Sequence, residues 1–230
     1  MLIPLSYPLT LNSPLYPGTP VPAVRPYNPP GSGTHPRSSI ISVHSHSGTH
    51  IDLPPHFCPE GIGNDPLSPP GLTFFPARCI GIPLDPASTI TPGLLIPHLP
   101  SIRDAAAILV RTGSGAGRST DPEGYASSHP RVDPSVPAWL RAESPGLRLF
   151  GIDAISIADP SHRDEGRACH REFLCGSPPI LILEDADLED DRILDDPWTL
   201  HLFPLLAEWI DGLPVVAIAD TGDALWNRYI

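Results

Sequence analysis

Lysine is absent from this sequence. All 14 basic residues are arginines, and 26 acidic residues outnumber them, which gives a formal net charge of −12. Proteins that bind nucleic acids or anionic membranes draw much of their affinity from clustered positive charge. We therefore expect no nucleic acid and no membrane among the partners of this protein.

Long hydrophobic runs are also absent. No segment approaches the roughly 20 apolar residues that a transmembrane helix needs. The opening Met-Leu-Ile-Pro-Leu is too short and too interrupted by proline for a signal peptide, so we expect a cytoplasmic protein. The 230 residues, of which 40% are hydrophobic, can bury one large core, and a single domain over residues 1–230 is predicted.

Cysteine is scarce and lacks metal-binding spacing. The four cysteines form no CxxC pair: Cys58, Cys79, Cys169 and Cys175. In a chain without a secretion signal, a zinc knuckle or a disulfide framework is not expected, so four reduced, packed thiols are predicted. Cys58 lies two residues after His56, which leaves a thiolate nucleophile as an alternative, although no separate orienting base is evident.

Signatures of nucleotide and calcium sites are missing as well. The glycine-rich segment 113–117 lacks the Gly-Lys-Ser/Thr ending of a P-loop and the GxGxxG spacing of a dinucleotide site. We interpret it as a loop. The acidic run 184–191 has neither the turn glycine nor the closing glutamate of a calcium loop, and from Asp187 onward we interpret it as a solvated acidic face.

Proline, by contrast, is abundant. The 33 prolines cluster in residues 14–36 and 54–100, which predicts long irregular loops. In the N-terminal loop at about 14–36, tyrosines and other apolar residues are interleaved with the prolines. This loop is either an ordered segment that crosses another surface or a flexible surface loop, and composition favours neither.

Short apolar runs alternate with helical segments over the rest of the chain, which predicts a mixed α/β fold. The predicted strands cover residues 39–43, 78–84, 105–111, 147–152, 180–183 and 215–219. The predicted helices cover residues 135–142 and 161–174. For the second helix, Ser161 and Asp164 resemble a capping box and Gly176 marks the end.

The stretch His46-Ser-Gly-Thr-His50-Ile-Asp52-Leu-Pro-Pro-His56 places three imidazoles and a carboxylate within eleven residues. His50 and Asp52 are two residues apart, which puts both on one face of an extended segment, with Ile51 turned towards the core. A bend at Gly48 can fold His46 back towards them. This donor set predicts a site for zinc, manganese or iron, against a simpler interpretation as a histidine-rich surface loop.

His56 and His44 extend this hypothesis. His56 follows two stiffening prolines and suits a general acid or base. Elsewhere in the chain, His170 is predicted to project from a helix, and Glu184 to lie at the carboxyl end of a strand, where α/β sheets place their ligands. His44 either supports His46 or is a simple structural histidine.

The segment HSGTHIDLPPHF resembles the signature of the cyclase-like metal-dependent hydrolases, the family that contains bacterial kynurenine formamidase and isatin hydrolase. Other segments resemble landmarks of that family in the same order over nearly the whole chain: Leu5-Ser-Tyr-Pro-Leu, Tyr16-Pro-Gly, Val110-Arg-Thr-Gly113, Gly151-Ile-Asp153-Ala-Ile-Ser156, His170 with Glu184, and Gly212-Leu-Pro-Val-Val-Ala217. The resemblance implies a swivelling β/β/α fold with a barrel-like mixed sheet surrounded by helices.

The resemblance also implies roles for the site residues. It assigns metal binding to five of them: His46, His50, Asp52, His170 and Glu184. His56 corresponds to the family's proton-transfer residue. Formamidase-like members use two ions that share the aspartate, whereas isatin hydrolase-like members are expected to use one, so one or two zinc or manganese ions are implied.

By the same resemblance, the expected activity is metal-assisted hydrolysis of a small-molecule amide, with an aryl formamide such as N-formylkynurenine as the leading substrate. A cyclic amide or lactone hydrolase, a polyketide-type cyclase and a non-catalytic metal-binding protein are the alternatives. A homodimer is expected, with the proline-rich N-terminal loop reaching across to the second copy.

Overall fold

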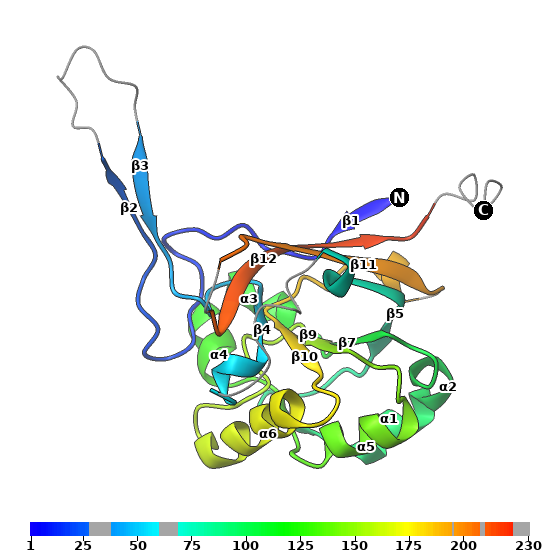
Figure 1. Ribbon diagram of the computed structural model, residues 1–230. Helices are drawn as coiled ribbons and strands as arrows, with labels where there is room; N and C mark the ends of the chain where they lie inside the picture. Colours follow the sequence, from blue (N-terminus) through cyan, green and yellow to red (C-terminus); the bar gives the residue numbers. More distant parts are fainter. Residues whose placement is uncertain (28–37, 60–68, 195, 208–209, 223–230) are drawn as a thin grey trace.

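A closed barrel of seven strands forms the centre of the molecule. The computed structural model describes residues 1–27, 38–59, 69–194, 196–207 and 210–222. Around the barrel the order is β12, β11, β5, β7, β9, β10 and β4, and β4 pairs with β12 to close the ring, while β1 extends the sheet beside β12 (Figure 1). The strands are β1 (Leu2–Pro4), β4 (His50–Asp52), β5 (Thr73–Gly81), β7 (Ala107–Arg111), β9 (Leu149–Ile152), β10 (Leu181–Glu184), β11 (Trp198–Pro204) and β12 (Gly212–Asp220).

The barrel contains two kinds of strand pairing. Strands β5, β7, β9 and β10 run parallel, and β4, β11 and β12 pair antiparallel with their neighbours. Central parallel strands are covered on both faces, which explains why β9 and β10 are buried at every position and β7 at all but its last. The predicted α/β fold with a barrel-like mixed sheet is confirmed.

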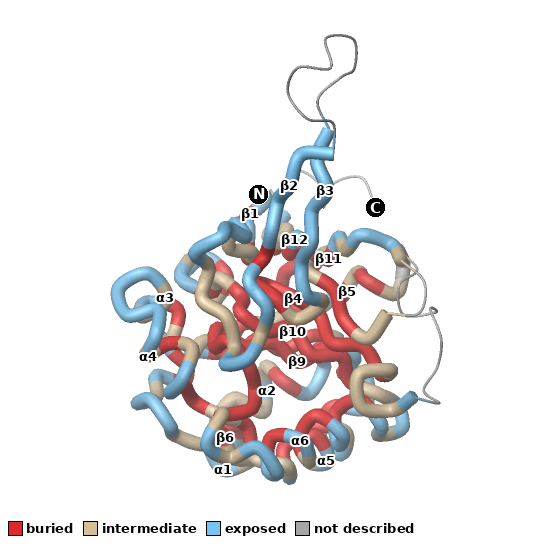
Figure 2. Tube along the Cα trace, turned by 90° about the vertical axis from the view of Figure 1, so that its left-hand side faces the viewer, coloured by how far each residue is buried: buried red, intermediate tan, exposed pale blue. Residues whose placement is uncertain are grey.

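The alternation of side chains along these strands divides the core in two. Leu109, Leu149 and Leu183 belong to the cluster inside the barrel, together with Phe74 and Trp198. Their neighbours along the chain point to the other face and belong to a second cluster beneath the helices: Ile108, Val110, Phe150 and Ile182. Figure 2 shows these strands as the buried centre of the molecule.

Short helices cover the outside of the barrel. The helices are α1 (Pro92–Leu95), α2 (Leu99–Ile102), α3 (Gly117–Thr120), α4 (Pro122–Ser127), α5 (Val136–Glu143) and α6 (Arg163–Cys175), with 3-10 turns η1 (Pro54–His56), η3 (Pro69–Leu72), η4 (Ile96–His98), η5 (Ser114–Ala116) and η6 (Asp191–Ile193). A two-residue parallel pair joins β6 (Thr89–Ile90) to β8 (Arg131–Val132). Among the described residues, no helix combines the length and apolarity needed to cross a membrane.

The longest helix, α6, differs from its prediction at its start. It begins at Arg163, and Ser161 does not cap it, because the N-cap residue is His162 and makes no side-chain capping bond. The amide of Ser161 instead donates to the carboxylate of Asp159 at 2.6 Å, so the predicted capping box is wrong. The predicted end is confirmed, since the helix stops at Cys175, directly before Gly176.

Part of the proline-rich N-terminal region is regular structure. Strands β2 (Ala23–Pro26) and β3 (Ser39–Ser42) form an antiparallel hairpin, all of whose paired residues are exposed. The hairpin stands out from the body of the molecule (Figures 1 and 2). The strand predicted at residues 39–43 is therefore confirmed, but it lies outside the barrel. The prediction of a loop at 14–36 is wrong for the residues of β2, and residues 28–36 of that loop lie outside the described part of the chain.

Candidate metal centre

Strand β4 delivers two of the predicted ligands to the same point. His50 and Asp52 lie at its two ends and are both buried, while Ile51 between them belongs to the core inside the barrel. The period of two along a strand therefore places them as predicted. In the pairing of β4 with β10, His50 lies opposite Glu184, so the register of these strands brings the glutamate to the site.

Asp52 lies at the centre of the cluster. Its Oδ1 is 2.7 Å from His46 Nδ1 and 3.3 Å from His50 Nε2, and its Oδ2 is 3.5 Å from His170 Nε2. Glu184 lies 3.3 Å from His50 Nε2 and 3.4 Å from His170 Nε2. The structure thus brings together all five residues that were predicted to bind metal.

Backbone carbonyls fix the orientation of two imidazoles. His50 Nδ1 lies 2.8 Å from the carbonyl of Gly48, and His170 Nδ1 lies 2.8 Å from the carbonyl of Gly166, one turn earlier in α6. An Nδ1–H that donates to a carbonyl leaves Nε2 as the electron-pair donor, and both Nε2 atoms face the carboxylates.

Gly48 has φ of +64°, which a residue with a side chain adopts only under strain, and this makes the bend that was predicted before β4.

Glu184 is held by the loop that follows β9. Its Oε1 accepts hydrogen bonds from the Ser156 hydroxyl at 3.0 Å and from the Ile157 amide at 2.7 Å. These donors leave Oε2 directed towards His50. Sequence reasoning assigned no role to Ser156, although it belongs to the segment Gly151-Ile-Asp153-Ala-Ile-Ser156.

The donor set fits a divalent metal ion. The buried Nε2 of His50 and Oδ2 of Asp52 have no hydrogen-bond partner among the described residues. Buried polar atoms are rarely left unpaired, and three histidines with two buried carboxylates suit zinc, manganese or iron. Within the described residues, two groups of side chains place their donor atoms close enough together to hold a metal ion. One group is His46, Asp52 and His56, the other is His50, Asp52 and Glu184, and Asp52 belongs to both.

The electrostatics of the cluster favour protons on the imidazoles when no metal is bound. Burial opposes the charged form of His46, but Asp52 and Asp211 outweigh it and raise the pKa of His46 to about 9. The same balance, with Asp52 and Glu184 as the carboxylates, raises the pKa of His50 well above its usual value. Burial opposes the ionised form of Glu184 too, yet the adjacent imidazoles lower its pKa to about 2. A metal cation would take the place of these protons.

His56 behaves differently from the other imidazoles. Burial lowers its pKa, and the neighbouring His46 and His170 add to this effect against the attraction of Asp52. Its ring centroid lies 4.0 Å from that of His46 and 5.9 Å from that of His170. A half-buried, neutral imidazole beside the cluster can accept a proton near neutral pH. Its donor atom also lies close enough to His46 and Asp52 for a metal ion.

Sequence reasoning missed Asp211. This residue directly precedes β12, and its carboxylate lies 3.2 Å from His46 Nε2 and 3.6 Å from His56 Nδ1. The next residue, Gly212, leaves room for the His46 ring, because a Cβ there would lie 2.6 Å from the ring. The only signal in the sequence was an acidic residue directly before the segment Gly212-Leu-Pro, which resembles a landmark of the family. A single acidic residue is too common to predict a role.

His44 supports His46, as one of its two predicted interpretations proposed. The backbone amide of His46 donates to His44 Nδ1 at 3.2 Å. The cluster lines a cavity of about 300 Å³, which His44 also lines. Tyr16 and Pro17 from the N-terminal segment, Phe57 after η1, and Arg163 and Arg167 from α6 form other parts of the wall.

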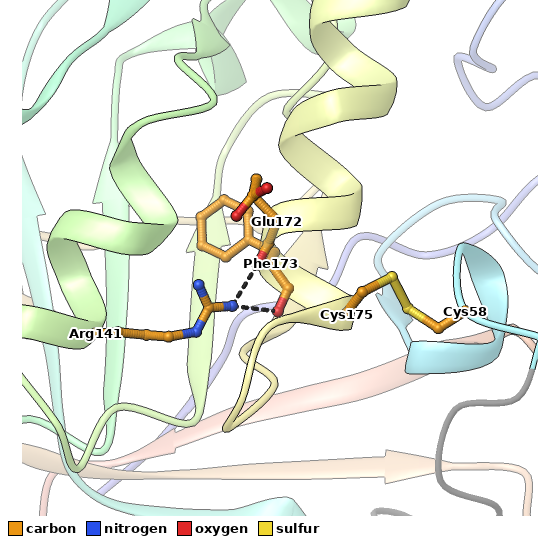
Figure 3. Close-up of a disulfide and its surroundings, with 5 residues drawn as sticks. All are labelled: Cys58, Arg141, Glu172, Phe173 and Cys175. Carbon is orange, nitrogen blue, oxygen red and sulfur yellow. Dashed lines mark hydrogen bonds between the residues drawn. A yellow bond between two sulfur atoms is a disulfide. The ribbon is translucent and has the colours of Figure 1, made fainter.

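The prediction of four reduced cysteines is wrong for one pair. Cys58 and Cys175 form a disulfide (Figure 3), whereas Cys79 and Cys169 are buried free thiols. The two partners are 117 residues apart, and only the packing of η1 against α6 brings their Cα atoms to 5.8 Å. The alternative of a Cys58 thiolate nucleophile is wrong for the same reason, because its sulfur is bonded to Cys175.

The disulfide lies beside a second contact that fixes the end of α6. Arg141 of α5 donates to the carbonyls of Glu172 and Phe173 in the last turn of α6 (Figure 3). It also donates to the carbonyl of Pro178 beyond the helix. A cation at a helix C-terminus satisfies its free carbonyls and complements its dipole. The helix that carries His170 is therefore held at its end by both α5 and η1.

Comparisons with known proteins agree with this geometry. The family model described as “Putative cyclase” matches residues 3–159, which include the motif from His46 to His56. Kynurenine formamidase of Geobacillus thermodenitrificans is 32% identical over 222 residues, covering 94% of this chain and 95% of that protein. Kynurenine formamidase of Bacillus cereus (strain ATCC 14579) is 31% identical over 224 residues, with the same coverage.

Solved structures share the fold. Isatin hydrolase A from Ralstonia solanacearum superimposes with a TM-score of 0.76 at 18% identity, covering 95% of this chain and 91% of that one. A structure described as a potential metal-dependent hydrolase with cyclase activity gives a TM-score of 0.76 at 20% identity, covering 97% and 98%. The family model and the formamidase relatives together show that this chain belongs to the cyclase family.

Proposed function

We propose that the protein is a metal-dependent hydrolase that cleaves the carbon–nitrogen bond of a small-molecule amide, most specifically an aryl formamide such as N-formylkynurenine. The observation that carries this proposal is the buried cluster of three histidines and two carboxylates that lines a cavity, with the neutral His56 beside it. The relatives that are 31–32% identical over nearly the whole chain and are named kynurenine formamidase support the substrate class.

His46, His50, Asp52, His170 and Glu184 would hold one or two divalent ions, zinc or manganese. A divalent metal in such a site polarises a carbonyl and makes water a nucleophile near neutral pH. The convergence of His170 and Glu184 on Asp52 supports two ions that share the aspartate, because together these residues offer more donors than one tetrahedral ion needs.

His56 would move the proton that hydrolysis requires. Burial keeps its imidazole neutral near pH 7, so it can accept a proton from the attacking water and pass it to the departing nitrogen. Asp211 lies 3.6 Å from His56 Nδ1 and would orient the ring. The aromatic ring of Phe57, stacked on His170 with centroids 5.1 Å apart, shields this side of the cavity.

The decisive experiment is N-formylkynurenine hydrolysis by purified protein that has been stripped of metal and then loaded with zinc or manganese. We expect metal-dependent turnover with kcat/KM above about 10⁴ M⁻¹s⁻¹, within the usual range for an enzyme on its own substrate. A fully loaded sample that hydrolyses isatin or a lactone but not the formamide would reject the substrate. Stoichiometric metal without turnover of any amide or lactone would reject the assignment of the protein as a hydrolase.

A further inference from the structure

One face of α6 carries two arginines into the wall of the cavity. Arg163, Arg167 and His170 are spaced by four and three residues, so they lie above one another along the helix. All three line the cavity, and His170 is the one that reaches the metal cluster. Arg171, one position beyond His170, is exposed like Arg163 and Arg167 but falls outside this lining.

Neither of these two guanidinium groups pairs with a buried carboxylate of the described residues. Arg163 contacts the carbonyl of Pro160 at 3.3 Å and forms no ion pair with a described residue. Arg167 lies 3.5 Å from Asp164, but the two side chains are 65% and 98% exposed, so this pair contributes little. By contrast, Arg118 makes two hydrogen bonds of 2.8 Å to a single buried carboxylate.

The rest of the wall suits an aromatic body. Ile155, Ala158, Pro17 and Phe57 line the same cavity and offer apolar surface. Tyr16 closes it from the N-terminal segment, and its phenol is close enough to Arg163 for the guanidinium to oppose the rise in pKa that burial causes. A ligand in the cavity would therefore meet apolar walls together with the metal cluster and two guanidinium groups.

We propose that Arg163 and Arg167 form a carboxylate-binding subsite, which positions an amide substrate through a carboxylate remote from the scissile bond. This inference rests on the proposed function and adds to it the residues that recognise the substrate's carboxylate. Arginine is the side chain best suited to bind a carboxylate through two parallel hydrogen bonds. In N-formylkynurenine an ammonium group accompanies the carboxylate, so the molecule has no net charge, and the arginines would act through hydrogen bonds at short range and not through long-range attraction.

The spacing along the helix matches such a substrate. With a rise of 1.5 Å per residue, the Cα atoms of Arg167 and Arg163 lie about 5 and 10 Å along the axis from His170. In N-formylkynurenine, seven bonds separate the formyl carbon from the carboxylate carbon. An extended chain of seven bonds of about 1.5 Å spans roughly 9 Å, which is comparable with these distances between Cα atoms.

The test compares two formamides on the metal-loaded enzyme: N-formylkynurenine, and 2-formamidoacetophenone, which keeps the aryl formamide but lacks the amino-acid group. The variant is Arg163→Gln with Arg167→Gln, and Arg171→Gln is the matched control on the same helix. We expect the ratio of the two kcat/KM values, N-formylkynurenine over 2-formamidoacetophenone, to fall about 10- to 100-fold in the double variant, chiefly through KM, because charge-assisted hydrogen bonds to the carboxylate are lost. Arg171→Gln should leave the ratio unchanged.

A binding measurement separates this subsite from the reaction. Calorimetric titration with kynurenine, which keeps the carboxylate, should show weaker binding to the double variant than to the wild type and to Arg171→Gln. If the wild type hydrolyses both formamides and the double variant changes neither ratio nor binding, the subsite is refuted while the proposed function stands. If the wild type hydrolyses neither formamide, the proposed function fails, and kynurenine titration alone then decides whether the arginines bind the carboxylate.

Discussion

His56 is the residue on which the chemistry of the proposed reaction depends most directly. In His56→Ala the proton carrier is lost, whereas Asp52 and the four ligands around it remain, so turnover should fall by about 10²- to 10⁴-fold with metal still bound. Steady-state kinetics and metal analysis of the same preparation check this. Loss of metal together with activity would instead make His56 a ligand, as its proximity to His46 and Asp52 also permits.

Asp52 holds the centre together. Its two oxygens lie within 3.5 Å of three different imidazoles, so Asp52→Ala should lose both ions if the carboxylate is shared. Inductively coupled plasma mass spectrometry after dialysis measures the metal content. Asp164→Asn, an almost fully exposed acid on α6, is the control and should keep its metal. Two metal equivalents in Asp52→Ala would refute the shared carboxylate.

Metal binding should strengthen as the pH rises. Asp52 and Asp211, outweighing burial, raise the pKa of His46 to about 9, so below that pH the metal-free imidazole carries a proton that a metal must displace. Each displaced proton weakens the apparent affinity about tenfold per unit of falling pH. Competition with a chromophoric chelator between pH 6 and pH 8 measures this slope. An affinity that is independent of pH would contradict the assignment of His46 as a ligand.

The sequence was informative about the centre because the spacing of a motif constrains local geometry. Two residues on a strand share a face whatever surrounds them, which placed His50 and Asp52 without a structure. The prediction of His170 and Glu184 needed the resemblance. Both residues lie at least 118 positions after Asp52, and no local rule brings such distant residues to one point. Asp211 could not be found, because it meets His46 only through the pairing of β12 with β4.

At the scale of elements, the disulfide joins the two parts of the fold that carry His56 and His170. It closes a loop of 117 residues, which reduces the entropy of the unfolded chain. Cys58→Ser with Cys175→Ser should therefore lower the free energy of unfolding by about 2–4 kcal/mol. Denaturant titration measures the loss.

A reducing agent supplies the matched control for the disulfide. It should lower the unfolding midpoint of the wild type towards that of the double variant and leave the variant unchanged. Equal midpoints for the oxidised wild type and the variant would show that the bond adds no stability.

Apolar runs predicted the parallel strands well, because strands that are buried on both faces must be apolar throughout. Strand β11 was missed, although Trp198, Leu200 and Leu202 alternate with more exposed residues and give a period of two. The capping box before α6 failed because Asp159 offered the Ser161 amide a competing acceptor. Such competition between nearby side chains is decided by backbone geometry that the sequence does not specify.

At the scale of the whole molecule, closure of the barrel was the feature that local sequence patterns predicted least. It depends on β4, three residues long, pairing with β10 on one side and β12 on the other, more than 120 residues along the chain. The predicted barrel came from the family resemblance and not from periodicity. That closure also builds the site, because it sets His50 opposite Glu184 and brings Asp211 to His46.

The hairpin of β2 and β3 supports the expected homodimer, which we propose on the following grounds. An isolated two-stranded hairpin is marginally stable in water, and exposed apolar patches often mark interfaces. Val24 and Ile41 face one another across this hairpin and are 59% and 72% exposed, with Tyr27 exposed nearby. A second copy of the chain would cover them.

Light scattering coupled to size-exclusion chromatography should therefore give twice the chain mass of 24.7 kDa for the wild type. Val24→Ser with Ile41→Ser should shift the protein towards monomer, because burying a hydroxyl in place of apolar surface weakens such a contact. Ile96→Ser changes an equally apolar side chain, 56% exposed on η4, and should leave the mass unchanged. A wild-type monomer would refute the dimer, and a dimeric double variant would place the interface elsewhere on the molecule.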